Sequence, residues 1–304
     1  MTKFIVVHRQ DENNVGDIAA NPLQYFLQKD EYQVIDISKI HQSYYKAGIP
    51  IIVGGGGLLG NEFFGDSLKN LLQSNDKNQL LDLYDKKWRC SNPANNELAD
   101  EFSVKFHDLI NQYLEKIEND KAPKIVWGAG HNGDVTKKNK GTFIFPNYLA
   151  EFKLVGIRDY GQNINWVPCA SCMHPALQKT YTIKNDIIWF EHKKQLIKDF
   201  GNDSIPRFIN SGSNIEQTIE LLGSANIIIT NSYHGAFWGT LLKKRVVVVQ
   251  PWSTKFYGFK HAPAISEKIE TWRESLEQAR VYDYALEECM SVTTNYWDTI
   301  KQLC

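Results

Sequence analysis

The stretch NIIITNSYHGAFWGTLLKKRVVVVQP, residues 226–251, decides the fold that we expect for this chain. Two apolar runs rich in β-branched residues, 227–230 and 246–249, flank a polar turn and a segment with the pattern of a helix. Continuous apolar runs, rather than alternating ones, are typical of parallel strands that are buried on both faces. The stretch therefore predicts a strand–helix–strand unit of an α/β protein.

Short apolar runs of the same kind recur along the chain, separated by stretches with helical patterning. They are FIVVH (4–8), QVIDI (33–37), IPIIVGGGG (49–57), KIVWGAG (124–130), LVGIRD (154–159), DIIWF (186–190), RFIN (207–210), NIIIT (226–230) and RVVVVQ (245–250). Amphipathic stretches lie between them at 97–119 and 214–223, the second with Ser213 as its N-cap and Gly223 as its stop. This alternation predicts a doubly wound α/β fold.

A polar segment that contains proline and glycine, residues 160–185, connects two halves that each begin with a strand. We expect an N-terminal Rossmann-like domain over 1–165, a second one over 166–285, and a C-terminal helix over 286–304 that packs back on the first domain. The whole of the last segment, 264–304, is helical in pattern. The predicted fold class is therefore α/β, with two Rossmann-like, doubly wound halves facing a cleft.

Composition and charge argue against several classes of protein. The 304 residues are 42% hydrophobic and 23% charged with a formal net charge of −1, so no overall positive field favours nucleic acid. No apolar run is long enough for a membrane span, and the run in MTKFIVVHRQ is too short for a signal peptide, which favours a cytoplasmic protein.

Five cysteines, an odd number, give no disulfide framework. Cys169, Cys172 and His174 look like half a zinc site, but no second ligand pair exists, so we expect no metal.

Ligands of open α/β sheets bind outside the carboxyl ends of the strands, so the residues that follow each run are candidates. Asn14 and Asp17 follow the first run, where an acidic residue is also a common helix cap. Gly55 and Gly56 belong to the glycine run after the third strand. Such a run lets a ligand approach the backbone closely, or serves only as a tight turn. Its spacing matches neither a P-loop nor a dinucleotide fingerprint.

Three further candidates follow later runs. His131 stands in GAGHN after the fourth run, and Arg158 stands where the chain leaves the fifth. Lys255, in STKFYGF, comes just after the ninth and would add positive charge. The alternatives are a surface salt bridge for the arginine and a solvated loop position for the lysine.

The strongest candidates lie in the opening stretch, where Asn231, Ser232 and His234 lead into a helix expected over 234–243, with Gly235 in its first turn. Free backbone N–H groups and the helix dipole favour a phosphate or carboxylate at such a position. A histidine there is suited to proton transfer or to holding an anion. The alternative is a buried, hydrogen-bonded structural histidine.

These motifs together resemble the polysaccharide pyruvyl transferase family. The shared features are Asn-x-Gly-Asp near the start, a strand ending in GGGG, a strand ending in GAG, an Arg-Asp pair after a strand, TNSYHG before a helix, the strand RVVVVQP and then STKF. They follow one another in the family's order from Asn14 to Phe256.

The resemblance implies a glycosyltransferase-B-like fold, with phosphoenolpyruvate as donor co-substrate, a saccharide acceptor and no other cofactor. It assigns His234 to donor binding or general acid catalysis, Arg158 to the anionic groups of the donor, and Asp17 to the acceptor side as a base. The remaining candidates divide in the same way, with Asn231, Ser232, Gly235 and Lys255 on the donor side and Asn14, Gly55, Gly56 and His131 on the acceptor side. The acceptor would then belong to the first domain and the donor to the second.

The chain departs from the family's pattern at two places. Ser232 stands where many members carry an arginine two residues before the histidine, so one donor-binding cation is missing. Cys-Ala-Ser-Cys, residues 169–172, replaces an Asp-Pro element.

Three functions from different classes therefore remain as hypotheses. The first is transfer of a pyruvyl group to a surface polysaccharide or glycan precursor, where a lipid-linked acceptor would bring the protein to the inner face of the membrane. The second is glycosyl transfer from a nucleotide sugar on the same scaffold, with the loop 211–217 near the nucleotide. The third is a noncatalytic carbohydrate-binding subunit, for which the aromatic content of 12% gives only weak support.

Overall fold

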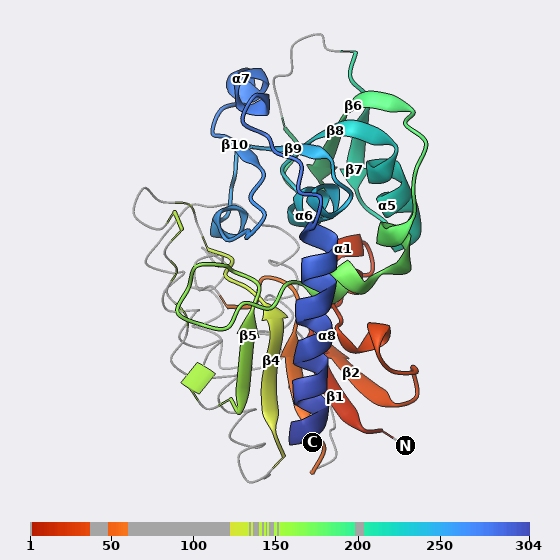
Figure 1. The fold of residues 1–304 in the computed structure, drawn as a ribbon, viewed down its shortest axis with the longest axis vertical. Helices are drawn as coiled ribbons and strands as arrows, with labels where there is room; N and C mark the ends of the chain where they lie inside the picture. Colours follow the sequence, from red (N-terminus) through yellow and green to blue (C-terminus); the bar gives the residue numbers. More distant parts are fainter. Residues whose placement is uncertain are drawn as a thin grey trace, which may run out of the picture.

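The computed structural model describes residues 2–36, 48–59, 122–133, 135, 140–141, 143, 145, 149–150, 152–197 and 204–304. These residues form two parallel β-sheets of five strands each, one in either half of the chain (Figure 1). The helix expected over 97–119 lies outside the described residues.

The two sheets have the same topology. The first, in the order β2-β1-β3-β4-β5, consists of β1 (Phe4–His8), β2 (Tyr32–Asp36), β3 (Ile51–Gly54), β4 (Lys124–Ala129) and β5 (Leu154–Ile157). The second, in the order β10-β9-β8-β6-β7, consists of β6 (Asn185–His192), β7 (Arg207–Asn210), β8 (Ala225–Thr230), β9 (Arg245–Val249) and β10 (Ala264–Ser266). If the strands of the second half are numbered from β6 and the sheet is read from the β7 edge, its order is also second, first, third, fourth and fifth strand. Each sheet therefore has its topological switch point beside its own first strand, between β1 and β3 and between β6 and β8.

Each of the nine apolar runs overlaps one of these strands. The tenth strand, β10, contradicts the prediction that 264–304 is helical throughout. It has only three residues, which pair with β9 from Ala264 opposite Val247. A segment this short shows no period of its own, so pairing with the neighbouring strand decides its conformation.

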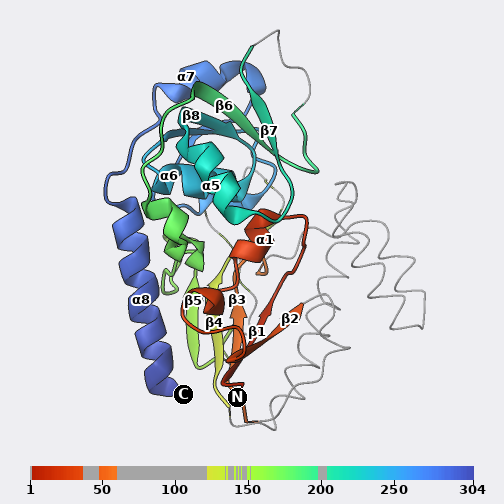
Figure 2. The same cartoon turned by 90° about the vertical axis from the view of Figure 1, so that its right-hand side faces the viewer.

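Helices follow the strands in both halves. Those of the described part are α1 (Val15–Ala19), α5 (Ile215–Gly223), α6 (Tyr233–Leu241), α7 (Trp272–Leu276) and α8 (Ala285–Leu303), with short 3-10 turns at Leu23–Tyr25, Ala170–Met173, Pro175–Gln178, Thr254–Tyr257 and Ile269–Thr271. Helix α8 runs along one face of the first sheet (Figures 1 and 2). There Tyr296 and Trp297 pack with Val6 and Trp127 in a buried cluster, so the end of the chain closes the core of the first half.

The second sheet is covered on both faces. Helices α5 and α6 pack with Ile228 and Val248 on one face, while Trp272 of α7 packs with Ile229 and Val247 on the other. This two-sided burial explains why the strands of this half read as continuous apolar runs.

The ends of α5 differ by one residue from the prediction. Asn214, rather than Ser213, is the N-cap, because its side-chain oxygen accepts a hydrogen bond from the backbone N–H of Gln217 at 3.0 Å. The C-cap is Ser224, and Gly223 is the last helical residue. A Cβ on Gly223 would lie 2.2 Å from the ring of Tyr181, so this glycine gives packing space and does not stop the helix.

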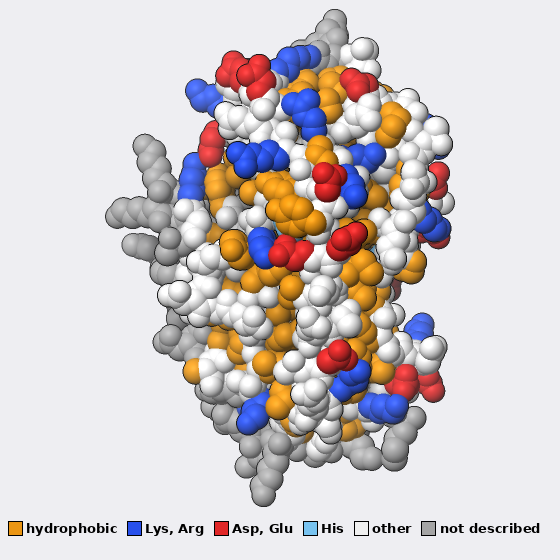
Figure 3. All heavy atoms as spheres, in the orientation of Figure 1, with side chains coloured by type: hydrophobic (Ala, Val, Ile, Leu, Met, Phe, Trp, Pro, Cys, Tyr) orange, Lys and Arg blue, Asp and Glu red, His pale blue; other side chains and the backbone are white. Residues whose placement is uncertain are grey.

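On the face seen in Figure 3, lysine and arginine side chains alternate with aspartate and glutamate and do not gather into one patch. This distribution agrees with the formal net charge of −1. Within the described part of the chain, no helix combines the length and the apolar character that crossing a membrane requires.

Candidate functional site

A cavity of about 110 Å³ lies between the two halves, and both contribute to its walls. The first half supplies Asp11, Asn14, Asp17, Gly56, Gly57, Asn132 and Arg158. The second half supplies His192, Lys193, Lys194, Asn210, Ser232, Tyr233, His234, Trp252 and Lys255.

The topology explains why these residues meet. Asn14 and Asp17 follow β1, and Gly56 follows β3, so they stand at the switch point of the first sheet. His192 ends β6, and His234 follows β8, so they stand at the switch point of the second. Since ligands of open α/β sheets bind at such points, the cavity occupies the expected ligand position of both sheets at once.

A contact between α1 and α6 joins the two halves at the cavity. Gly16 lies so close to the ring of His234 that a Cβ at this position would be 2.1 Å from His234 Nδ1. Only glycine allows this approach, since any larger side chain would displace the imidazole. The contact brings Asp17 and His234, which are far apart in sequence, into the lining of one cavity.

The amino end of α6 points into the site. Ser232 is its N-cap, and its hydroxyl oxygen accepts hydrogen bonds from the backbone N–H of Gly235 at 3.4 Å and from Asn210 Nδ2 at 2.9 Å. Asn210 is 4% exposed, and its Oδ1 has no hydrogen-bond partner among the described residues. A helix amino end favours an anionic group of a ligand, and the unpartnered amide oxygen, which only accepts hydrogen bonds, suits a hydroxyl group.

Arg158 is one of two buried cations in the lining. Its side chain is 4% exposed, and its guanidinium carbon lies 3.8 Å from the centroid of the Tyr233 ring. Gly130 makes room for it, because a Cβ there would lie 2.3 Å from Arg158 Nε. That Nε atom is buried and has no hydrogen-bond partner in the described part of the chain. The arginine is therefore held in position by packing and keeps a donor available for a ligand.

Lys255 is the second buried cation. It is 8% exposed, and its Nζ atom lies 3.7 Å from the centroid of the Trp252 ring. Burial lowers the pKa of Lys255 well below its ordinary value, the charge of Arg158 lowers it further, and Asp17 partly offsets both. No carboxylate of the described residues forms an ion pair with either cation. Two buried charges of one sign favour binding of an anion between them.

Asp17 and His234 carry the proton chemistry of the site. Burial raises the pKa of Asp17 to about 7, with the charge of Arg9 acting in the opposite direction. Asn14 Nδ2 donates a hydrogen bond to Asp17 Oδ2 at 2.9 Å. Burial also lowers the pKa of His234 well below its ordinary value, and the charges of Arg158 and Lys255 lower it further. The empty site therefore combines a neutral imidazole with a carboxyl that changes protonation near neutral pH.

The structure brings together most of the residues predicted from the sequence, but not all of them. Those that line the cavity are Asn14, Asp17, Gly56, Arg158, Ser232, His234 and Lys255. Those outside its lining are Gly55, His131, Asn231 and Gly235.

The second group supports the walls of the cavity. His131 Nδ1 bonds the Thr254 hydroxyl at 2.7 Å, which ties the loop before Lys255 to the first half. Asn231 Oδ1 accepts from the backbone N–H of His192 at 2.7 Å. Gly55, with φ of 73°, and Gly235 both stand where a Cβ would collide with neighbouring atoms.

Sequence reasoning missed several lining residues, of which His192, Asn210 and Trp252 are the most informative. His192 and Asn210 are the last residues of β6 and β7, and Trp252 follows β9. Burial, followed by the charge of Lys255, lowers the pKa of His192 to about 3. The signal that could find them is a polar or aromatic residue at the end of a strand. No candidate residue predicted from the sequence lies at the end of β6 or β7, and after β9 the candidate is Lys255 rather than Trp252.

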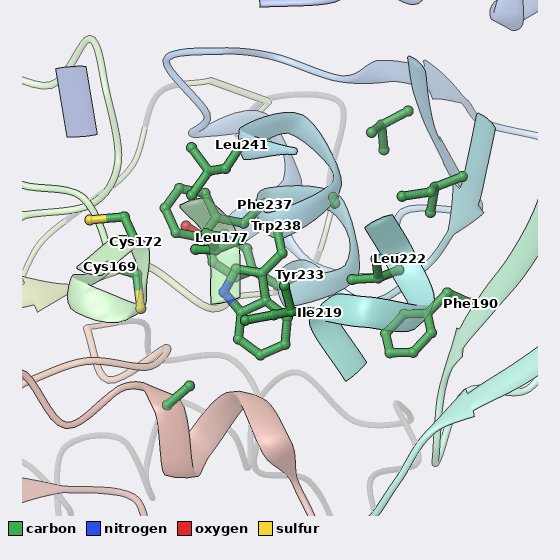
Figure 4. Close-up of a cluster of buried hydrophobic side chains, with 14 of the residues drawn as sticks. Cys169, Cys172, Leu177, Phe190, Ile219, Leu222, Tyr233, Phe237, Trp238 and Leu241 are labelled. Carbon is green, nitrogen blue, oxygen red and sulfur yellow. The ribbon is translucent and has the colours of Figure 1, made fainter. Parts of the chain in front are cut away.

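Cys169 and Cys172 are both buried, in the cluster of apolar side chains shown in Figure 4. Cys172 Sγ lies 3.3 Å from the hydroxyl of Thr293, and Cys169 Sγ lies 3.5 Å from His234 Nε2. In the part of the chain that the structure describes, no group of three or more histidine, cysteine, aspartate or glutamate side chains is placed to hold a metal ion.

The fold and the cavity define an α/β protein of two like halves with a candidate site for a small anion between them. No family model and no curated protein matches the chain. A functionally uncharacterised protein from Klebsiella pneumoniae subsp. pneumoniae NTUH-K2044 is similar in structure, with a TM-score of 0.42 and 14% sequence identity over 82% of this chain and 83% of that one.

Proposed function

We propose that the protein is a pyruvyl transferase, which moves a pyruvyl group from phosphoenolpyruvate to sugar hydroxyls of a surface polysaccharide or glycan precursor. One observation carries the proposal. Arg158 and Lys255 are buried in one cavity beside the amino end of α6, without a described carboxylate as ion-pair partner. Phosphoenolpyruvate has a carboxylate and a phosphate, and these two anionic groups fit two cations and a helix amino end.

The motifs that resemble the pyruvyl transferase family support the same proposal. Asn14, Asp17, Arg158, His234 and Lys255 all belong to those motifs, and all of them line the cavity. We further propose that the halves have a glycosyltransferase-B-like arrangement, with the acceptor on the side of the first sheet and the donor on the side of the second.

The proposed reaction assigns a separate proton step to each titratable group. Ionised Asp17 takes the proton of an acceptor hydroxyl, whose oxygen bonds to C2 of phosphoenolpyruvate, while C3 receives a proton from His234. The oxygen of a second hydroxyl then bonds to the same carbon, its proton goes to His234, which is neutral again after the first step, and phosphate leaves with the electron pair of its C–O bond. This assigns a base to Asp17 and an acid to His234.

Binding of the donor would prepare His234 for this role. In the empty cavity, the charges of Arg158 and Lys255 add to burial in lowering the pKa of His234. An anion that pairs with both cations cancels that contribution, so the donor itself raises the pKa of the histidine.

A panel of ligands tests the proposal by thermal shift. Phosphoenolpyruvate, pyruvate, phosphate and common nucleotide sugars are added to the wild type, to His234→Ala and to Lys268→Met, a change at an exposed lysine outside the cavity. A ligand that binds the folded state raises its melting temperature with saturation. Stabilisation by phosphoenolpyruvate in the wild type and in Lys268→Met, but reduced in His234→Ala, supports pyruvyl transfer. Stabilisation by a nucleotide sugar alone overturns it in favour of glycosyl transfer.

A further inference from the structure

A chain of buried hydrogen bonds leads from α6 through the segment before β6 and back to His234. Trp238 Nε1 lies 3.0 Å from Ser171 Oγ, Ser171 Oγ lies 3.3 Å from Cys169 Sγ, and Cys169 Sγ lies 3.5 Å from His234 Nε2. Trp238, Ser171 and Cys169 are fully buried. Cys169 does not line the cavity, so it contacts the site only through the histidine.

Chemistry fixes the direction of the first two bonds of this chain. An indole N–H only donates, so the Ser171 oxygen accepts from Trp238 and the Ser171 hydrogen goes to Cys169 Sγ. In the contact between Cys169 Sγ and His234 Nε2 either atom can hold the hydrogen, and the thiol hydrogen has no other acceptor among the described residues. A ring nitrogen that accepts a hydrogen bond carries no proton, so the proton of a neutral imidazole resides on the other nitrogen.

We infer that Cys169 is a positioning residue, which holds neutral His234 in the tautomer with its proton on Nδ1. That nitrogen lies on the side of Gly16 and has no hydrogen-bond partner among the described residues. The Nδ1–H group is therefore the one without a partner among the described residues.

The charge states of both partners agree with this arrangement. Burial raises the pKa of the Cys169 thiol, so the sulfur keeps its proton at neutral pH. Burial lowers the pKa of His234, so the imidazole remains neutral. A thiolate–imidazolium pair, which a nucleophilic cysteine would need, is disfavoured on both sides.

The consequence for catalysis rests on the proposed function, whereas the tautomer itself does not. In the proposed reaction, donor binding lets Nε2 take up a second proton, and the resulting imidazolium gives one proton to C3 and returns to the neutral form. The residues Cys-Ala-Ser-Cys, which replace the Asp-Pro element of the resembled family, would then orient the histidine of this chain.

The tautomer is measured directly by NMR of protein labelled with ¹⁵N-histidine, without ligand and above neutral pH. The His234 signals are identified by their absence in His234→Gln. We expect a protonated Nδ1 and an unprotonated Nε2 in the wild type. Cys169→Ala should lose this pattern, Cys169→Ser should retain it because a hydroxyl still donates to Nε2, and Cys172→Ala, at the neighbouring buried thiol that bonds Thr293, should leave it unchanged.

A wild-type spectrum with the proton on Nε2 would overturn the inference, and so would an unchanged tautomer in Cys169→Ala. The wild-type spectrum alone decides the question if the alanine variant does not fold. Because no donor is present, failure of this test is distinct from failure of phosphoenolpyruvate to bind.

Discussion

At the scale of single residues, the site depends on groups whose properties are set by burial. Asp17 alone would be an ordinary carboxylate, but burial raises its pKa to about 7. Arg158 and Lys255 are buried, and an anionic ligand between them would favour the charged form of Lys255, whose pKa burial lowers. Burial of these groups without a ligand lowers the stability of the folded protein, and binding of an anion would offset that loss.

Replacing Asp17 by asparagine should change how stability depends on pH. The pKa of Asp17 is higher in the folded state than the ordinary 3.8, so the wild type loses stability as pH rises from that value through about 7. Between pH 5 and pH 8, Asp17→Asn should gain about 2–3 kcal/mol relative to the wild type. Urea unfolding at both pH values measures this. Asp283→Asn, at an exposed aspartate, is the control, and an equal difference from wild type at both pH values for Asp17→Asn would contradict the account.

Replacing Gly16 by alanine should disturb the contact between the halves. The added Cβ would lie 2.1 Å from His234 Nδ1, so the ring must move, at a cost of about 1–3 kcal/mol. Denaturant unfolding of Gly16→Ala, His234→Ala and the double variant measures the coupling between the two positions. The double variant should recover part of the lost stability, because the colliding ring is gone. Strict additivity of the two changes would show that the collision is not the cause.

At the scale of elements, the central strands were predictable because they are buried on both faces and so read as apolar runs, whereas the edge strands β2 and β7 are partly exposed. β1 and β7 match their runs residue for residue. β10 was not predictable, since its three residues take their conformation from β9. The sequence predicts that an element exists more accurately than it predicts the residues at which the element begins and ends, as the caps of α5 show.

The N-cap of α5 gives a matched pair of substitutions. Asn214→Ala removes the hydrogen bond to the backbone N–H of Gln217 and should destabilise the protein by about 1 kcal/mol. Ser213→Ala, one residue earlier on the same exposed loop, should have little effect. Thermal or denaturant unfolding of both variants distinguishes them, and a larger loss for Ser213→Ala would restore the cap predicted from sequence.

At the scale of the whole molecule, the site exists because two sheets of the same order place their switch points against each other. Asp17 and His234 were both predictable as strand-end residues, but their shared cavity was not, since it depends on the approach of α6 to Gly16. The same reason applies to Asn210 and Trp252, which enter the site only through tertiary packing. Helix α8, which follows the second half in sequence and packs on the first sheet, links the two halves through the chain itself (Figure 2).

The most direct test of the central claim is calorimetric titration of phosphoenolpyruvate into the wild type, Arg158→Gln, Lys255→Met and the control Lys268→Met. Each charge-assisted contact contributes about 1.5–3 kcal/mol, so each cavity variant should bind at least about tenfold more weakly, with the control unchanged. Equal affinity in the wild type and both cavity variants, or no binding by the wild type, would contradict a donor site built on Arg158 and Lys255.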